Sequence, residues 1–123
     1  MSTKQIVVIV IILAVVIGGL FLIPNDASSK YDGFAECLKD KGAQFYGAFW
    51  CPHCAEQKKL FGRAQKYLPY IECSTPDSKG QLQVCTDKGV KSYPTWFFAD
   101  GTRIDGKASL ETLAEKTMCE LPQ

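Results

Sequence analysis

The most constraining feature of the sequence is a pair of cysteines separated by two residues, in the segment WCPHC (residues 50–54). The aromatic-rich residues 44–50 lead into it and predict a buried strand, and the apolar stripe of residues 51–67 predicts a helix. A proline suits the first turn of a helix, where its missing N–H costs nothing. Two cysteines three positions apart on that turn bring their sulfur atoms within bonding distance. The segment therefore predicts a redox-active pair at a strand–helix junction.

The two cysteines differ in position, so we expect them to differ in role. Cys51 lies at the helix N-terminus, where free N–H groups and the helix dipole favour the thiolate, the form that attacks a disulfide. Cys54 lies further into the helix, less exposed, and is placed to resolve a mixed disulfide. His53 can direct a hydrogen bond or a positive charge toward the Cys51 sulfur, which would stabilise the reduced form and make the pair an oxidant. The candidate catalytic residues of this segment are Cys51, Pro52, His53 and Cys54.

The alternative interpretation of such a cysteine pair is half of a zinc site, which needs two further ligands. Cys73 and Cys85 are available, but residues 74–84 separate them and neither belongs to a second Cys-x-x-Cys segment. His53 is the single histidine of the chain. The preceding strand and the proline on the first turn fit redox chemistry better, so we expect no metal and no other cofactor.

The N-terminus carries a second constraint, because residues 6–23 are an unbroken run of Ile, Val, Leu, Ala, Gly and Phe. A helix of that length spans roughly 27 Å, close to the hydrocarbon thickness of a bilayer. We expect a transmembrane anchor over residues 1–24, a polar linker over residues 25–30 and one domain over residues 31–123. A cleaved signal peptide is the alternative, although the apolar regions of such peptides are shorter.

Charge and cysteine content predict the side of the membrane on which the domain lies. Lys4 precedes the apolar run, and the positive-inside rule then places the N-terminus in the cytoplasm and the domain on the extracytoplasmic side, whether periplasmic, extracellular or lumenal. All 6 cysteines follow the run, and paired cysteines persist outside the reducing cytosol. The formal net charge of +1 argues against nucleic-acid binding.

The remaining pattern predicts the element order α-β-α-β-α-β-β-α for the domain. The further elements are helices over residues 32–41 and 81–88, strands over 70–73, 95–98 and 102–105, and a last helix from Ser109 to about Met118. An Asp-Gly turn at residues 100–101 joins the last two strands. The aromatic residues expected in the core are Phe45, Tyr46, Phe49, Phe97 and Phe98.

A second motif, SYPTW (residues 92–96), precedes the predicted hairpin. Taken alone, its proline could belong to an ordinary trans turn. Together with FYGAFWCPHC and EQKKLFG, however, the motif resembles the thioredoxin fold, and more narrowly the thioredoxin-like domain found with vitamin K epoxide reductase homologues in bacteria and plants. The resemblance covers about residues 31–118.

This resemblance implies a substrate-binding surface next to the cysteine pair. It implies that Pro94 is cis and lies against the Cys51–Cys54 sulfurs, and that the backbone of Tyr93 pairs with a substrate strand. We also expect Trp50 and Trp96 to frame the surface around the site.

The resemblance further implies a disulfide relay. The domain would take electrons from reduced or unfolded proteins and pass them to a quinone-linked membrane partner of vitamin K epoxide reductase type, or to another membrane redox partner. That partner is not in this chain, because one span cannot supply a multi-helix reductase unit. A reductase or isomerase fed by a membrane electron carrier is the first alternative, and a non-catalytic interaction module with the same fold is the second.

Two departures from the usual thioredoxin pattern are visible. No strand precedes the helix predicted over residues 32–41, so we expect a trimmed thioredoxin-like α/β fold, with a mixed sheet of about four strands flanked by helices and preceded by the transmembrane helix. The strand before the motif also contains no acidic residue. Proton exchange at Cys54 must then use Glu56, water or the substrate.

Four cysteines remain outside the motif. Cys73 and Cys85 flank a turn-rich segment, and the family resemblance supports a structural disulfide between them, with a second redox relay or free thiols as alternatives. Cys37 and Cys119 would then tie the first helix of the domain to the end of the last one. In the thioredoxin layout those helices tend to lie on opposite faces of the sheet.

Overall fold

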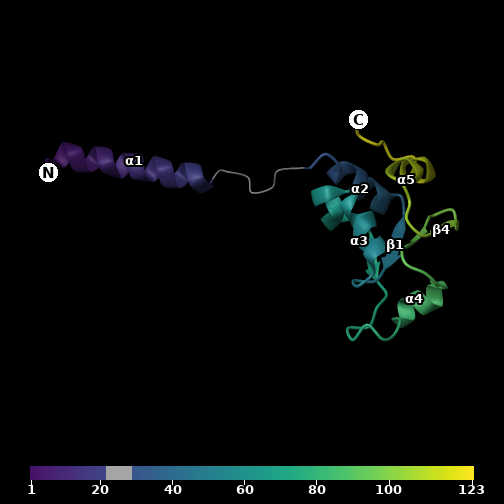
Figure 1. Ribbon diagram of the computed structural model, residues 1–123. Helices are drawn as coiled ribbons and strands as arrows, with labels where there is room; N and C mark the ends of the chain where they lie inside the picture. The colour runs from purple at the N-terminus through teal and green to yellow at the C-terminus, as the bar shows by residue number, and fades with distance from the viewer. Residues whose placement is uncertain (22–28) are drawn as a thin grey trace.

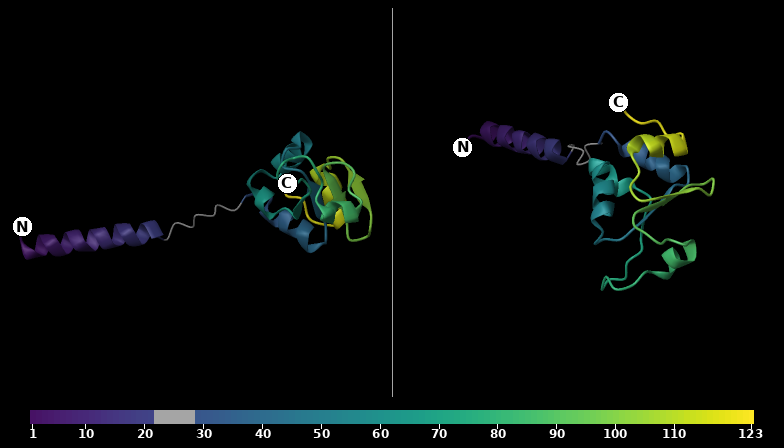
Figure 2. Two further views of the ribbon diagram at one scale, coloured as in Figure 1. Left: turned by 90° about the horizontal axis from the view of Figure 1, so that it is seen from below. Right: turned by 45° about the vertical axis from the view of Figure 1, so that its right-hand side comes forward.

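The computed structural model describes residues 1–21 and 29–123, and it confirms the predicted order of elements (Figure 1). The helices are α1 (Thr3–Phe21), α2 (Asp32–Asp40), α3 (Pro52–Lys59), the 3-10 helix η1 (Gly62–Tyr67), α4 (Gln83–Lys88) and α5 (Leu110–Thr117). The strands are β1 (Gln44–Gly47), β2 (Tyr70–Glu72), β3 (Thr95–Phe97) and β4 (Arg103–Asp105). The loop before α4 and α4 itself lie at the end of the domain away from α2 and α5 (Figures 1 and 2).

The described strands form one four-stranded mixed sheet in the order β2-β1-β3-β4. β2 runs parallel to β1 because α3 and η1 carry the chain back between the two strands, whereas β3 and β4 are antiparallel additions. Phe45 in β1 pairs with Tyr70 on one side and with Trp96 on the other. The predicted α/β fold with a trimmed, thioredoxin-like sheet is therefore confirmed.

The helix predicted over residues 51–67 is interrupted. α3 ends at Lys59, and a 3-10 helix begins at Gly62, whose φ of 54° lies in the left-handed region that favours glycine. The interruption leaves both Phe61 and Ala64 fully buried, and the ring of Phe61 stacks on Phe34 of α2 with the centroids 5.9 Å apart. A single straight helix was predicted because the apolar stripe continues past the break.

Two aromatic residues occupy environments opposite to those predicted. Trp96 does not frame the surface: its side chain is fully buried, and its ring stacks on Phe45 at 4.8 Å in the centre of the core. Phe49 is not a core residue, because β1 ends at Gly47 and Phe49 lies in the following loop with 58% of its surface exposed. The Phe49 error concerns the point at which a strand ends, which pattern alone locates poorly. Trp96 lies inside β3, and it is buried because its ring packs on Phe45 of the neighbouring strand.

The described part of the predicted membrane span is helical: α1 contains residues 6–21. Residues 22 and 23 of the span, like linker residues 25–28, lie outside the described residues. Of the helices that the structure describes, none has both the length and the apolar content needed to cross a membrane.

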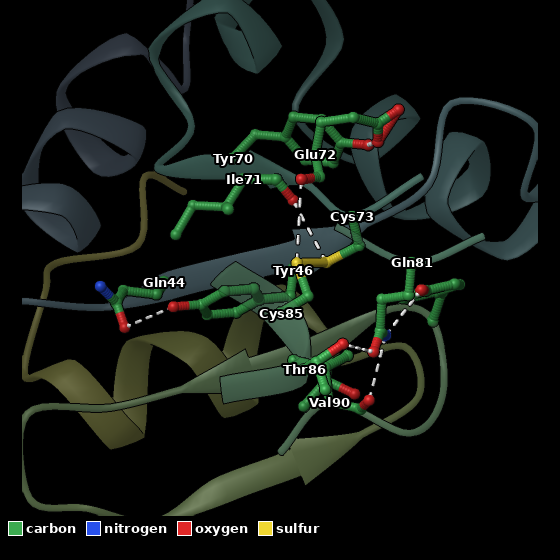
Figure 3. The surroundings of a disulfide bond; sticks show 12 residues. Gln44, Tyr46, Tyr70, Ile71, Glu72, Cys73, Gln81, Cys85, Thr86 and Val90 are labelled. Atoms are coloured by element: carbon green, nitrogen blue, oxygen red, sulfur yellow. Dashed lines mark hydrogen bonds between the residues drawn. A yellow bond between two sulfur atoms is a disulfide. The ribbon is translucent and has the colours of Figure 1, made fainter. Parts of the chain in front are cut away.

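Both predicted structural disulfides are present, Cys37–Cys119 and Cys73–Cys85. The second bond is fully buried in a small core of its own, packed with Tyr46 and Val90 beside the sheet (Figure 3). The first joins α2 to the segment that follows α5. The domain thus has a cross-link on each side of its main core.

The two disulfides should contribute unequally to stability, because a cross-link restricts the unfolded chain more when it closes a longer loop. The sequence separations are 82 residues for Cys37–Cys119 and 12 for Cys73–Cys85. Replacing the first pair by alanines should lower the free energy of unfolding by roughly 4.5 kcal/mol, and replacing the second pair by roughly 3 kcal/mol in chain entropy. Urea denaturation of the two double variants measures the difference. A larger loss for the Cys73–Cys85 variant would show that its buried packing outweighs loop length.

Candidate functional site

The cysteine pair lies where β1 passes into α3. The backbone N–H of Cys51 donates to the carbonyl of Ala48 at 3.0 Å, which closes a turn, and Cys51 then caps the N-terminus of α3 with extended backbone angles. Pro52 occupies the first turn, as predicted. Cys54 follows on the same turn, and the two sulfurs are the unbonded thiols of the structure. The strand–helix junction predicted from the motif is confirmed.

The two thiols have unequal environments. Cys51 is 6% exposed and Cys54 is 1% exposed, so Cys51 is only slightly more accessible. Burial raises the pKa of the Cys54 thiol well above its ordinary value, and the neighbouring Cys51 acts in the same direction. A hydrogen bond with the Ala48 backbone and, to a smaller extent, the positive charge of Lys58 partly offset this rise in pKa. Cys54 is therefore a neutral thiol at physiological pH, which suits a group that reacts second.

The second sequence motif lies against the first. The Tyr93-Pro94 peptide bond is cis, as the resemblance implied, and Pro94 is fully buried. The carbonyl oxygen of Tyr93 accepts a hydrogen bond from the Cys51 sulfur at 3.6 Å. A backbone acceptor thus lies directly next to the more accessible sulfur.

Aromatic side chains surround this point. Trp50 is 50% exposed, and its ring meets the ring of Tyr93 edge to face at 5.9 Å. The indole N–H of Trp50 donates to the Ser74 hydroxyl at 2.8 Å, and the Tyr93 hydroxyl accepts from the Gln81 amide at the same distance. The exposed ring of Phe49 precedes Trp50 in the same loop. The surface next to Cys51 is therefore formed by the rings of Trp50 and Tyr93, which hydrogen bonds to Ser74 and Gln81 hold in place.

The imidazole of His53 faces a carboxylate. Its Nδ1 lies 3.4 Å from Glu56 Oε2, and the Lys107 ammonium binds the same carboxylate oxygen. The hydrogen bond from Lys107, reinforced by His53, lowers the pKa of Glu56. Glu56 is therefore a weaker base than an ordinary glutamate, which argues against it as the proton acceptor for Cys54. The predicted action of His53 on the Cys51 sulfur stays a prediction.

Gln57 is a positioning residue that the motif analysis missed. Its amide is fully buried; the oxygen accepts from the Ala108 N–H at 2.7 Å and from the Trp96 indole at 3.2 Å, and the nitrogen donates to the Ala108 carbonyl at 2.9 Å. These bonds fix α3 to β3 and to the loop before α5. The available signal was its position three residues after Cys54, on the same face of the helix.

Tyr70 and Glu72 of β2 were also missed. The Tyr70 hydroxyl donates to Glu72 Oε2 at 2.7 Å, and the other carboxylate oxygen accepts from the Phe49 N–H at 2.8 Å. Glu72 thereby ties β2 to the loop that leads into Cys51. The contact between Glu72 and this loop could not be predicted from the sequence, because the residues of a short strand of mixed polarity do not indicate which loop lies beside it.

The zinc alternative finds no support in the geometry. Cys73 and Cys85, its possible further ligands, are bonded to each other. Within residues 1–21 and 29–123, no group of three or more His, Cys, Asp or Glu side chains is placed to hold a metal ion.

A cysteine pair at a helix N-terminus, a cis-proline segment against it and a four-stranded mixed sheet together define a thioredoxin-like domain. Comparison with known proteins agrees. The chain is 44% identical over 105 residues to the thiol-disulfide oxidoreductase LTO1 of Arabidopsis thaliana, in an alignment that covers 80% of this chain. It is 30% identical over 90 residues to protein disulfide-isomerase 5-1 of Arabidopsis thaliana and 33% identical over 90 residues to protein disulfide isomerase-like 2-2 of Oryza sativa subsp. japonica. The resemblance inferred from the sequence is confirmed.

The chain spans only part of these relatives. It covers 27% of LTO1, 24% of the rice protein and 62% of protein disulfide-isomerase 5-1. No protein-family model matches the chain. What is shared with the three relatives is thus one thioredoxin-like domain related to thiol–disulfide oxidoreductases.

Cys54 should react with an alkylating reagent only at strongly alkaline pH, because burial raises its pKa and the thiolate is the reactive form. In a Cys51→Ser variant of the full chain, the rate of reaction with iodoacetamide should rise with a midpoint well above pH 8.5, the ordinary value for a free cysteine. The Cys54→Ser variant serves as the matched control, reporting Cys51 alone. A Cys54 midpoint at or below pH 8.5 would contradict the role assigned to its burial.

Proposed function

We propose that this chain is a thiol–disulfide oxidoreductase in which Cys51 exchanges disulfides with protein substrates. Cys54 is the leaving group when a substrate thiolate attacks Cys51, and it is the resolving thiol when Cys51 has attacked a disulfide. The observation that carries the proposal is the pair of unbonded sulfurs at the start of α3, the more accessible one bonded to the Tyr93 carbonyl. The similarity to LTO1 and to two protein disulfide isomerases supports the same chemistry. A non-catalytic module would have no need of two adjacent cysteines at a helix N-terminus next to that carbonyl.

The proposed reaction transfers two electrons from substrate to domain. A substrate thiolate attacks the Cys51 sulfur of the Cys51–Cys54 disulfide, and Cys54 leaves with the electron pair and takes up a proton. A second substrate thiolate then attacks the substrate sulfur of the mixed disulfide, and Cys51 leaves. The products are an oxidised substrate and a reduced domain.

Substrate recognition would use main-chain groups and aromatic contact. An extended segment can pair with the backbone of Tyr93 while its side chains lie on Trp50 and Phe49, the exposed rings of this surface. Main-chain pairing is indifferent to sequence, so many unfolded chains would qualify. Folded proteins would not, because their strands are already paired.

The oxidising direction is proposed over reduction on the basis of compartment. The domain holds two structural disulfides of its own, and such bonds persist where thiols are not kept reduced. The reduced pair would then be reoxidised by a membrane redox partner, of vitamin K epoxide reductase type if the resemblance extends that far. A reduction potential of about −120 to −180 mV would support the oxidant, and one near about −270 mV would support a reductase.

The proposal includes attachment to a membrane through residues 6–23, with the domain on the extracytoplasmic side. It is supported by the absence of charge between residues 5 and 24 and by the exposed apolar side chains around α1, such as Ile6, Val10 and Ile17. Lys4 precedes the run and favours a cytoplasmic N-terminus.

Cysteine variants separate the two catalytic roles. Given a protein that carries scrambled disulfides, the Cys54→Ser variant should accumulate mixed disulfides, because Cys51 can form the intermolecular bond and the domain has lost the adjacent thiol that resolves it fastest. The Cys51→Ser variant should lose exchange activity to background and trap nothing. Non-reducing gel electrophoresis after acid quenching measures both outcomes. Mixed disulfides that accumulate through Cys54 instead would reverse the assignment.

Membrane attachment should depend on the apolar character of the N-terminal helix. The full chain should remain in the membrane pellet after alkaline carbonate extraction. The variant Val10→Lys with Leu13→Lys should be released, because each charge placed near the middle of a span costs roughly 3 kcal/mol. Replacing Lys4 by Gln, outside the run, is the control and should leave the chain in the pellet. Release of the unmodified chain by carbonate would refute the anchor.

A further inference from the structure

Lys58 occupies a special position relative to the buried thiol. It follows Cys54 by one helical turn on α3, so the two side chains extend from the same face of the helix. Its side chain is half-buried, and its ammonium lies 3.6 Å from the centroid of the Tyr70 ring. At that distance the cation is held by the electron-rich face of the ring.

The ring that holds Lys58 also lies next to the Cys54 sulfur. A Cβ atom added at Gly47 would lie 2.9 Å from the sulfur and 2.9 Å from Tyr70 Cε2, so the sulfur and the ring meet at the one residue of β1 that has no side chain. The ring cannot swing away, because its hydroxyl is bonded to Glu72 and Glu72 is bonded to the Phe49 N–H. β2 therefore fixes an ammonium group close to a thiol that burial keeps neutral at physiological pH.

The ionisable groups around Cys54 differ in what they do to its charge. Burial comes first and Cys51 second in raising the pKa of Cys54. Tyr70 stays neutral, because burial and the hydrogen bond to Glu72 raise its pKa far above physiological pH. The hydrogen bond with the Ala48 backbone and then the charge of Lys58 lower the pKa of Cys54, so Lys58 is the cation among these contributions. The Glu72 carboxylate is directed to Tyr70 and to the loop.

We propose that Lys58, held over the ring of Tyr70, stabilises the Cys54 thiolate while the disulfide with Cys51 forms or breaks. Lys58 is thus a positioning residue for the reaction, acting through its charge on a sulfur that has no acidic neighbour on β1. The inference rests on the proposed function of the cysteine pair and adds a residue to it. β1 has no acidic residue that could take the proton from Cys54. Lys58 helps in another way, because its positive charge stabilises the thiolate that forms when the proton leaves.

The exchange step in which Lys58 acts conserves electrons and protons without any further oxidant or reductant. When Cys51 is joined to a substrate or partner sulfur, Cys54 loses its proton and its thiolate attacks the Cys51 sulfur. The Cys51–Cys54 bond forms, the intermolecular bond breaks, and the departing thiolate takes up one proton. In the reverse step Cys54 is the leaving group and carries the same negative charge. The stabilisation therefore helps in both directions of electron flow.

The test compares two adjacent lysines of α3 in the full chain, solubilised in detergent. In the Cys51→Ser background, Lys58→Gln should raise the alkylation midpoint of Cys54 by about 0.5–1 pH unit. Lys59→Gln removes the same charge from the exposed neighbouring position and should leave the midpoint unchanged. Lys58→Arg keeps the charge and should restore most of the original midpoint.

A second variant tests the role of the ring itself. Tyr70→Leu keeps Lys58 but removes the surface that holds its ammonium, so the Cys54 midpoint should again rise. With Cys51 intact, Lys58→Gln should also slow release of a preformed mixed disulfide by roughly 3- to 10-fold at neutral pH, the rate ratio that such a shift in thiolate population gives. Lys59→Gln should not slow it.

The outcomes separate this inference from the function on which it rests. The role of Lys58 would be overturned if Lys58→Gln left the alkylation midpoint of Cys54 unchanged. It would also be overturned if Lys58→Gln and Lys59→Gln shifted that midpoint equally. A Lys58-specific shift in a chain that exchanges no disulfides with any protein substrate would support the electrostatic inference and refute the proposed function.

Discussion

The antiparallel pairing of β1 with β3 is the interaction on which the site depends. Because the two strands run in opposite directions, the end of β1 lies beside the start of β3, where Tyr46 pairs with Thr95. The end of β1 leads to Cys51, and Tyr93-Pro94 leads into β3. A shift of one residue in this register would exchange the two faces of the strand and remove the Tyr93 carbonyl from the sulfur.

Packing and hydrogen bonds in the core beneath the site stabilise the pairing of β1 with β3 in this register. Phe45 stacks on Trp96 across the strand pair, and the buried amide of Gln57 binds both the Trp96 indole and the backbone of Ala108. Leaving the buried Trp96 indole N–H without an acceptor would lower the free energy of unfolding by about 1–3 kcal/mol, and the Gln57 amide oxygen supplies that acceptor. The helix that carries the thiols is thus positioned by polar bonds as well as by apolar packing.

The sequence predicted those parts of the molecule that depend on local chemistry. Element order, the turn at Asp100-Gly101, the cap at Ser109 and the cysteine pair at a helix start all follow from residue type and spacing. The cis Tyr93-Pro94 bond and the Cys73–Cys85 disulfide needed the family resemblance, since neither spacing nor residue type selects them.

What remained hidden depends on contacts between distant segments. Phe49 is exposed because β1 ends before it, and Trp96 is buried because β3 lies beside Phe45 of β1; residue type reveals neither. Glu72 and Tyr70 act on the site only because β2 lies beside β1, and a three-residue strand carries no signal of its neighbours. The helix break at Gly62 likewise follows from how Phe61 packs against α2.

The Cys37–Cys119 bond has a consequence for how the chain matures during synthesis. Its two ends are the first and the last cysteines of the sequence, so the correct partner of Cys37 is made after all the others. Until then Cys37 shares the growing chain with the two thiols of the site and with the Cys73–Cys85 pair. The native pairing of Cys37 therefore waits until the segment that follows α5 has been synthesised, so the cross-link between α2 and that segment forms late.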